Sequence, residues 1–167
     1  MRGQRVRACE KGGEKTGQNP TDRGRPGSKR YLIVDANGIP LAVRLTPANV
    51  HDSRCFEDLI DAVPPIRQCW GRPRKRPDKL HADKAYDVPR CRKALRARRI
   101  KDRIARRGID TSERLGRHRW VIERTLAWFS RFRRLAVRYE RRADIHVAFL
   151  SLAAALICWS FVRRWSC

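Results

Sequence analysis

Two carboxylates in this sequence lie at positions where they could bind a divalent cation. Asp83 ends the short apolar stretch Lys79–Asp83, and Glu123 follows in the segment Arg119–Thr125. Carboxylate oxygens are the ligands that hard divalent cations prefer in proteins. On a chain rich in basic residues, such a pair indicates a metal site for phosphoryl transfer on nucleic acid.

Each acid also has a purely structural explanation. Glu123 lies four residues after Arg119, which is the spacing of an ion pair on the surface of one helix. Asp83 precedes the turn Tyr86–Pro89, where an aspartate commonly caps the backbone. Spacing alone does not decide between a metal ligand and a structural residue at either position.

The net charge indicates a polyanionic partner. Of the 167 residues, 40 are Lys or Arg and 17 are Asp or Glu, which gives a formal net charge of +23. Such an excess repels itself unless a polyanion neutralises it, so nucleic acid is the expected partner and its binding should weaken with salt. Hydrophobic residues make up 41% of the chain, which excludes a disordered basic tail.

Cysteine spacing and apolar runs bear on the compartment. The six cysteines show no C-x-x-C spacing, so we expect neither a zinc site nor a disulfide framework, and a reducing cytoplasm fits best. The apolar run Val147–Val162 is shorter than the roughly 20 residues that span a bilayer. We therefore expect a buried core helix there, with a membrane-associated helix as the alternative.

A hairpin and several alternating elements must position the two acids. Asn37-Gly38 separates the apolar runs Tyr31–Val34 and Ile39–Leu45, which strongly predicts a hairpin. A helix should follow, with Asp52 or Ser53 as its N-cap. The remaining expected elements are a strand over 79–83, a helix over about 88–99, a strand over 100–105, a helix over about 116–132, an extended or irregular segment over 134–139 and a helix over about 143–164.

This order of elements predicts one α/β domain, a mixed sheet flanked by helices. Residues 1–29 form a basic, loop-rich segment with at most a short strand at Val6–Cys9. Within the helix over 116–132, the 100° periodicity places the apolar residues on one arc and points Glu123 away from its middle, towards a cleft edge.

Seven blocks of the sequence, in their order and spacing, resemble bacterial insertion-sequence transposases of the DDE superfamily, in the insertion-sequence-five group. The blocks are 23–29 (RGRPGSK), 32–35 (LIVD), 38–43 (GIPLAV), 82–87 (ADKAYD), 104–107 (IARR), 118–125 (HRWVIERT) and 134 with 138–140 (R, RYE). The resemblance extends from about Val6 to Trp159. It implies that residues 30–167 form a transposase catalytic domain with a ribonuclease H-like fold.

The resemblance also implies a chemistry. In this family three acids, Asp, Asp and Glu, hold two Mg²⁺ (or Mn²⁺) ions that assist in-line attack on a DNA phosphodiester, in strand cleavage and strand transfer. Asp83 matches the second Asp, Glu123 the Glu and Arg119 the arginine before it. The implied partners are double-stranded DNA at the element ends and target, and a second copy in a synaptic complex. The implied place is the bacterial cytoplasm, at the nucleoid, and no membrane partner is expected.

The chain departs from the family at the first Asp. Counting back from Val6-Arg7-Ala8 places that position at Arg2, and a cation there would repel a metal ion. Asp35 and Asp52 are better explained by the hairpin turn and the helix cap. We therefore hypothesise a truncated or second-frame product with an incomplete N-terminal strand, completed by an upstream-frame product.

Such a chain would bind DNA but cleave it poorly, and whether it is an enzyme by itself stays open. The alternative is a catalytically inactive basic DNA-binding remnant of a transposase. Gly116 and Ser130 stand where the family carries a tyrosine and a basic residue. We expect Arg119 and the cluster Arg131, Arg133 and Arg134 to contact DNA, the cluster as a sequence-independent grip on phosphates.

Overall fold

The computed structural model describes residues 2–8, 12–20, 23–67, 69–106, 108 and 112–166, and for 2–8 and 112–119 it describes the backbone alone. The elements are β1 (Arg2–Ala8), β2 (Gly17–Gln18), β3 (Pro26–Val34), β4 (Pro40–Pro47), the 3₁₀ turn η1 (Asp52–Cys55), α1 (Phe56–Asp61), β5 (Lys79–Ala82), the 3₁₀ turn η2 (Lys84–Tyr86), α2 (Pro89–Ala97), β6 (Lys101–Ile104), α3 (Ser112–Arg131), α4 (Arg133–Ala136), β7 (Val137–Arg138) and α5 (Ala143–Trp165).

The main sheet is built around β3. This strand pairs antiparallel with β4 on one side, with Leu32 opposite Val43, and with β1, where Leu32 lies opposite Arg2. β2 pairs with the start of β3, and β7 runs parallel to β1. The predicted hairpin is therefore confirmed. β1 starts four residues earlier than the short strand expected at Val6, because it pairs with β3 along most of its length.

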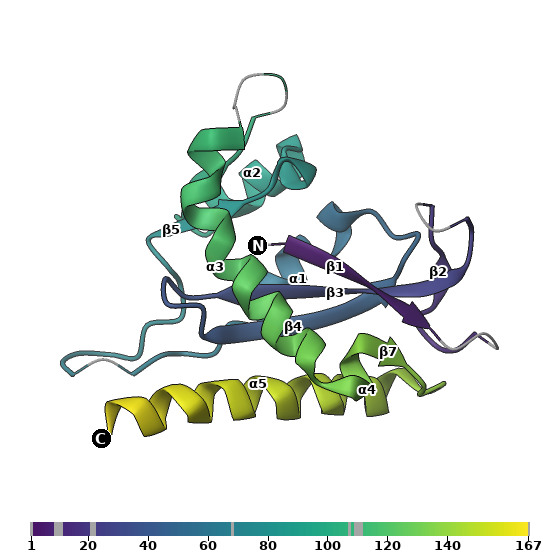
Figure 1. Cartoon of the computed structure of the whole chain (residues 1–167). Helices are drawn as coiled ribbons and strands as arrows, with labels where there is room; N and C mark the ends of the chain where they lie inside the picture. The colour runs from purple at the N-terminus through teal and green to yellow at the C-terminus, as the bar shows by residue number, and fades with distance from the viewer. Residues whose placement is uncertain are drawn as a thin grey trace.

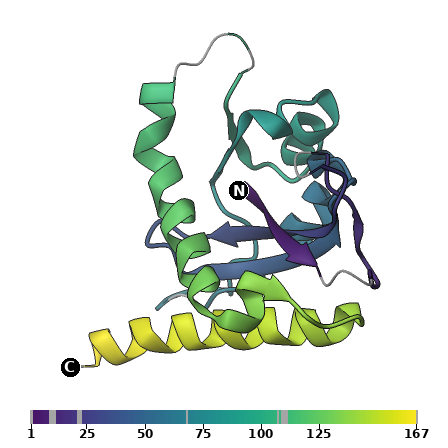
Figure 2. The ribbon, with the colours of Figure 1, turned by 45° about the vertical axis from the view of Figure 1, so that its right-hand side comes forward.

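Two hydrophobic cores lie on opposite faces of β3, since successive side chains of a strand alternate between faces. Tyr31 and Ile33 belong to the core that α1, α2, β5 and β6 line, whereas Leu32 belongs to the core that α3 and α5 line. In Figures 1 and 2, α5 runs beneath the sheet and α3 rises away from it. The two helices that carry the C-terminal third of the chain thus cover one face of the hairpin.

β5 and β6 form a separate two-stranded parallel sheet. Lys79 pairs with Lys101 and Ala82 with Ile104, and α2 connects the two strands. The α/β class expected from the sequence is confirmed, but the strands fall into two sheets among the described residues, whereas a single mixed sheet was expected. The buried side chains Leu80 and Ala82 join this small sheet to the core under α1.

Two local expectations differ from the structure. His51 is the N-cap of η1, with its Nδ1 accepting a hydrogen bond from the Ser53 N–H, so the predicted caps Asp52 and Ser53 were wrong. Half of the segment expected to be extended or irregular over 134–139 lies in the helical turn α4, and only β7 is a strand. Short polar segments of this kind are set by tertiary contacts that propensity does not report.

α5 follows the expected bounds, but one of its sides is exposed to solvent. Leu150, Ala153 and Ile157 are buried against the sheet, but Leu152 on the other side is 56% exposed. The prediction of a buried core helix is therefore wrong for one side of α5. By length and composition, α5 is apolar enough to cross a membrane, and this is weak evidence for a membrane span. In its most apolar 18-residue stretch, 22% is buried inside the protein.

Candidate functional site

Asp83 lies directly after β5, at the carboxyl end of a strand in a parallel pair. Its Oδ1 accepts a hydrogen bond of 2.7 Å from the Lys84 N–H, so the residue caps the turn η2. The capping role that the sequence suggested for Asp83 is thus confirmed. It engages one carboxylate oxygen and fixes the side chain at the strand end, where open α/β sheets place their functional groups.

Glu123 is exposed on α3, while its neighbours Ile122 and Leu126 are buried in the core. The periodicity therefore placed this acid on the correct side of the helix. The backbone of Arg119 lies in α3 one turn earlier, and its side chain is outside the described part of the chain, as is any Arg119–Glu123 ion pair.

The residues after Glu123 fasten α3 to the hairpin. The buried hydroxyl of Thr125 donates a hydrogen bond of 2.8 Å to the carbonyl of Gly38, and Arg124 Nη2 donates one of 2.6 Å to the carbonyl of Asn37. These two bonds hold the helix over the Asn37-Gly38 turn. The position of Glu123 is therefore set by the hairpin turn.

Arg124 is also held between two indole rings. Its guanidinium carbon lies 4.5 Å from the centre of the Trp120 ring and 5.0 Å from that of Trp128. Such contacts are cation–π interactions. Arg124 was not predicted as a functional residue, although Trp120, Arg124 and Trp128 have the i, i+4, i+8 spacing that stacks side chains on one helix face.

The predicted DNA-binding cluster lies at the C-terminal end of α3, which Arg131 closes, and in α4, which begins with Arg133 and Arg134. Arg131 and Arg133 are exposed. Arg134 Nη1 donates to Glu140 Oε1 at 3.0 Å, and its guanidinium lies over the rings of Tyr139 and Phe149, so packing already orients this side chain. At 1.5 Å per residue, Arg131 is about 12 Å along the helix from Glu123.

The two other aspartates considered as metal ligands have structural roles. Asp35 Oδ1 accepts hydrogen bonds from the N–H groups of Asn37 and Ile39, at 2.9 and 2.7 Å, inside the hairpin turn. Asp52 Oδ1 accepts from Lys29 Nζ at 2.9 Å and from the Tyr31 hydroxyl at 3.0 Å. The hairpin explanation of Asp35 is confirmed, and Asp52 serves an ion pair in place of the predicted cap.

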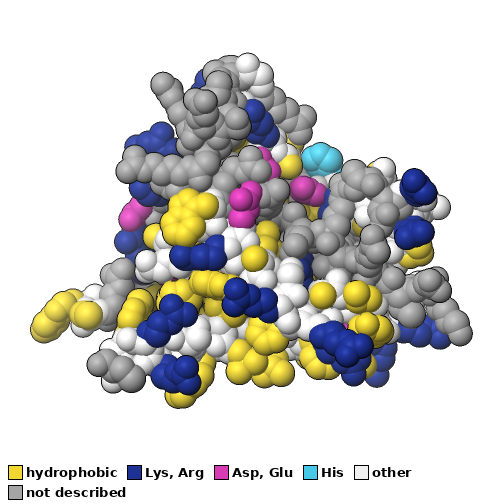
Figure 3. All heavy atoms as spheres, in the orientation of Figure 1, with side chains coloured by type: hydrophobic (Ala, Val, Ile, Leu, Met, Phe, Trp, Pro, Cys, Tyr) yellow, Lys and Arg dark blue, Asp and Glu magenta, His cyan; other side chains and the backbone are white. Residues whose placement is uncertain are grey.

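The donor set for a metal ion is partial. Asp83 and Glu123 carry the oxygen ligands that Mg²⁺ prefers, but within the described residues no group of three or more His, Cys, Asp or Glu side chains could hold a metal ion. The seven residues of β1, where the family's first Asp is expected, include no acid. Acidic side chains do gather on one face between α3 and α2, among basic ones (Figure 3).

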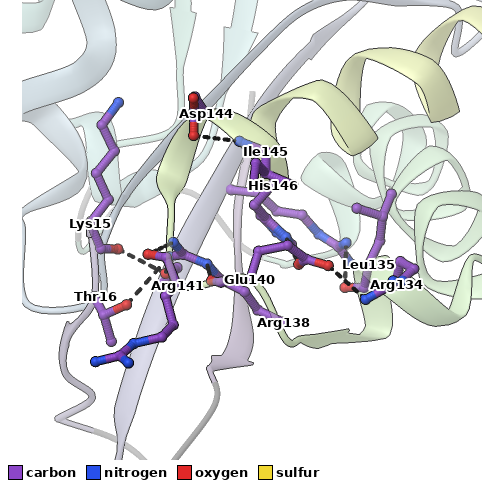
Figure 4. Close-up of polar contacts among 12 residues, drawn as sticks. Lys15, Thr16, Arg134, Leu135, Arg138, Glu140, Arg141, Asp144, Ile145 and His146 are labelled. Carbon is purple, nitrogen blue, oxygen red and sulfur yellow. Dashed lines mark hydrogen bonds and ion pairs between the residues drawn. The ribbon is translucent and has the colours of Figure 1, made fainter. Parts of the chain in front are cut away.

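A buried polar cluster ties the start of α5 to the sheet (Figure 4). Arg138 donates to Ser28 Oγ at 2.7 Å and to the Glu140 carbonyl at 2.9 Å, and His146 Nδ1 lies 3.2 Å from Glu140 Oε2. Burial lowers the pKa of the Arg138 guanidinium and of the His146 imidazole. Burial raises the pKa of Glu140, but hydrogen bonds from its own N–H and from His146 outweigh it, so the net pKa is lowered. The cluster stabilises the fold and lies apart from the two acids in sequence.

The chain belongs to the DDE transposase family, since the family described as Transposase DDE domain matches residues 3–158. It is 56% identical over 153 residues to a transposase for insertion sequence element IS402 from Burkholderia cepacia. The aligned region covers 92% of this chain and 72% of that protein. It is 28% identical over 136 residues to a transposase for insertion sequence element IS6501 from Brucella ovis, covering 78% and 96% respectively. No solved structure matches this chain. The predicted resemblance to insertion-sequence transposases is thereby confirmed.

Proposed function

We propose that this chain is the ribonuclease H-like catalytic domain of a DNA transposase that cleaves and joins strands of an insertion sequence with Mg²⁺ or Mn²⁺. The observation that carries the proposal is the family match over residues 3–158, together with Asp83, which is fixed at a strand end, and Glu123, which is exposed on α3. Together they would hold the divalent cation, which supplies an activated attacking oxygen and stabilisation of the leaving oxygen.

The residues around the two acids orient them. The Lys84 N–H holds the Asp83 carboxylate, and the bonds from Arg124 and Thr125 to the hairpin turn hold the α3 turn that bears Glu123. Positioning of this kind is what a phosphoryl-transfer site needs most, because misplacement of a ligand by about 1 Å is costly.

The first acid of the family is absent from β1 in this proposal, and Arg2 stands in its place. The chain by itself would then bind DNA and cleave it slowly, and a further polypeptide, such as an upstream-frame product, would supply the third ligand. The second candidate function, an inactive DNA-binding remnant, is favoured by the lack of a three-ligand group among the described residues.

Duplex DNA at the element ends and target is the proposed substrate. Arg119, Arg131, Arg133 and Arg134 would contact its phosphates, and a second copy would join in a synaptic complex at the nucleoid. Each arginine that contacts a phosphate contributes roughly one unit to the slope of log K against log salt. Arg131→Ala and Arg133→Ala should each lower that slope, whereas Arg134→Ala should also disturb its contact with Glu140.

Metal binding and nicking test the proposal together. Calorimetry with Mn²⁺ should show binding that Asp83→Ala and Glu123→Gln abolish, and nicking of labelled element ends should be slow. Arg2→Asp should raise both metal affinity and nicking if the missing acid is the only defect. Rapid nicking that survives Asp83→Ala would overturn the assigned site. Absence of metal binding in the native chain and in Arg2→Asp would favour the inactive remnant.

A further inference from the structure

One side of α5 presents an exposed apolar stripe with a heptad pattern. We call it the α5 seam, and its members are Ile145, Ala148, Leu152, Ala155, Trp159 and Val162. Every member is exposed, and the successive spacings are three, four, three, four and three residues. These are the spacings of positions a and d in a coiled coil, where one helix packs against another. No Lys, Arg, Asp or Glu lies between Ile145 and Val162.

The fold leaves the α5 seam uncovered. Leu152 is 56% exposed and Trp159 is 63% exposed, whereas Leu150 and Ile157 on the opposite side of α5 are buried in the core. In Figures 1 and 2, α5 forms the lower edge of the molecule, and no other described element lies beneath it. At 1.5 Å per residue the seam is about 26 Å long. Contiguous exposed apolar surfaces of this kind mark interaction sites.

The side chains of the α5 seam have volumes that suit a second, antiparallel copy of the same helix. When two copies meet about a two-fold axis at the middle of the seam, residue i of one faces residue j of the other, and j faces i. The facing pairs are then Ile145 with Val162, Ala148 with Trp159, and Leu152 with Ala155. In two of these pairs a large side chain meets an alanine, and such alternation lets facing helices interdigitate.

Charges at the two ends of α5 favour the same orientation. Asp144 lies at the N-terminal end of the seam, and Arg163 and Arg164 lie at its C-terminal end. Antiparallel packing places Asp144 of each copy beside the two arginines of the other, whereas parallel packing would bring like charges together. Because Asp144 already pairs with Arg142 of its own chain, these exposed charges select the orientation and add little affinity.

We propose that the α5 seam is an interface through which two copies of this chain pair antiparallel about a two-fold axis. The contact needs neither metal nor DNA, so it goes beyond the proposed function and does not depend on it. Each copy contributes a stripe about 26 Å long and about 10 Å wide, which places the interface in the small, transient class. The dimer should therefore dissociate on dilution, and in the dilute monomer Leu152 is a solvated residue.

Salt separates this contact from association through nucleic acid. A net charge of +23 on each copy makes two copies repel each other, and salt screens this repulsion. The dimer should therefore tighten as salt is raised, whereas copies bridged by nucleic acid should separate. Sedimentation equilibrium over a range of protein concentrations, at low and at high salt, measures both effects. A chain that is monomeric at every concentration, or a mass that falls with added salt, would overturn the proposal.

A double-mutant cycle tests which residues face each other. Trp159→Ala should raise the dissociation constant of the dimer at least about tenfold, since each indole occurs twice in a symmetric pair. Ala148→Leu should also raise it, through overpacking against Trp159 of the second copy. The variant with both changes should dimerise more tightly than either single variant, because a large residue again faces an alanine.

The cycle reports contact between copies only. Within one chain, positions 148 and 159 lie about 16 Å apart along α5, which is too far for direct coupling. Compensation in the double variant therefore supports the antiparallel pairing. Independent, additive losses from Trp159→Ala and Ala148→Leu would overturn it.

Trp165→Ala is the matched control for Trp159→Ala. Trp165 is 71% exposed on the same helix, but six residues at 100° each place it about 120° around α5 from Trp159. Its removal should leave the dissociation constant unchanged, and a loss equal to that of Trp159→Ala would overturn the assignment. Asp83→Ala should dimerise like the native chain, so failure of the metal site and failure of the α5 seam are distinguishable.

A lipid surface is the other occupant that an apolar stripe could take. Flotation of the protein with neutral phosphatidylcholine vesicles tests it without attraction between opposite charges. Absence of binding, together with a dimer in sedimentation, supports the contact between copies. Binding to the vesicles that Trp159→Ala abolishes and Trp165→Ala preserves, in a chain that stays monomeric, would overturn the proposal.

Discussion

Thr125 on α3 donates a hydrogen bond of 2.8 Å to the carbonyl of Gly38 in the hairpin turn, 87 residues away along the chain. The turn accepts this close approach because Gly38 has φ of +88° and no side chain. A Cβ at Gly38 would lie 2.8 Å from Thr125 Oγ1 and 3.1 Å from Arg124 Nη2. The turn and the helix that carries Glu123 are thus mutually positioned.

Gly38→Ala should therefore destabilise the protein beyond the cost of its backbone conformation. A left-handed non-glycine residue costs about 1–2 kcal/mol, and overpacking against α3 adds roughly 1–3 kcal/mol. Urea denaturation measures the change. Gly71→Ala is the control, since Gly71 has the same φ of +88° with no atom within 4 Å of its added Cβ. Equal losses in both variants would contradict the contact with α3.

The hairpin and the sides of the helices were predictable because local chemistry decides them. Asn37-Gly38 favours a tight turn between two apolar strands, and 100° periodicity separates Glu123 from Ile122 on α3. Both features are present in the structure. The placement of Asp83 at a strand end was predictable in the same way, because the apolar residues Leu80 and Ala82 alternate in β5.

Contacts between distant segments were not predictable from spacing. Asp52 looked like a helix cap, but folding brings Lys29 and Tyr31 to it from β3. The parallel pairing of β5 with β6 away from the main sheet depends on how α2 crosses between them. The one-sided exposure of α5 depends on what covers it, and hydropathy alone could not separate its two sides.

Asp52→Ala should destabilise the protein more than a surface ion pair would. Lys29 is buried, and its ammonium group would lose the Asp52 carboxylate and keep only its bond to the Val50 carbonyl, while the Tyr31 hydroxyl would lose its acceptor. Loss of one partner of a buried pair costs about 3–5 kcal/mol, and replacing both partners by apolar residues recovers much of this cost. Thermal and urea unfolding of Asp52→Ala and of the double variant Lys29→Met with Asp52→Leu measure this. A double variant no more stable than Asp52→Ala would argue against a buried charge as the cause.

The buried pair His146 and Glu140 predicts a loss of stability in acid. Burial lowers the pKa of His146 below 6.5, so the unfolded chain takes up its proton first as the pH falls. Stability from His146 is thus present above about pH 6.5 and is lost as the pH falls through the folded pKa. The net pKa of Glu140 is also lowered, so the stability that Glu140 contributes is lost as the pH falls below its ordinary pKa of 4.5.

Urea midpoints between pH 7.5 and pH 5 check this sign. The native midpoint should fall with pH over this range, and His146→Gln should flatten the dependence because no imidazole remains to titrate. Leu152→Gln is the control, since Leu152 is 56% exposed on the same helix and carries no titrating group, and the pH dependence of this variant should follow that of the native protein. A native midpoint that rises as the pH falls would contradict the buried neutral state of His146.

Substitutions on the two sides of α5 should change the free energy of unfolding by different amounts. Leu150 is 1% exposed and Leu152 is 56% exposed, only two residues along the same helix. Leu150→Ala leaves a cavity and should cost about 2–5 kcal/mol, whereas Leu152→Gln changes a solvated position and should stay within about 0.5 kcal/mol. Gln and Leu have similar helix propensity, so the comparison isolates packing. Should Leu152→Gln cost as much as Leu150→Ala, the exposed side of α5 must be covered in solution, and equilibrium sedimentation of both variants would then show whether a second copy covers it.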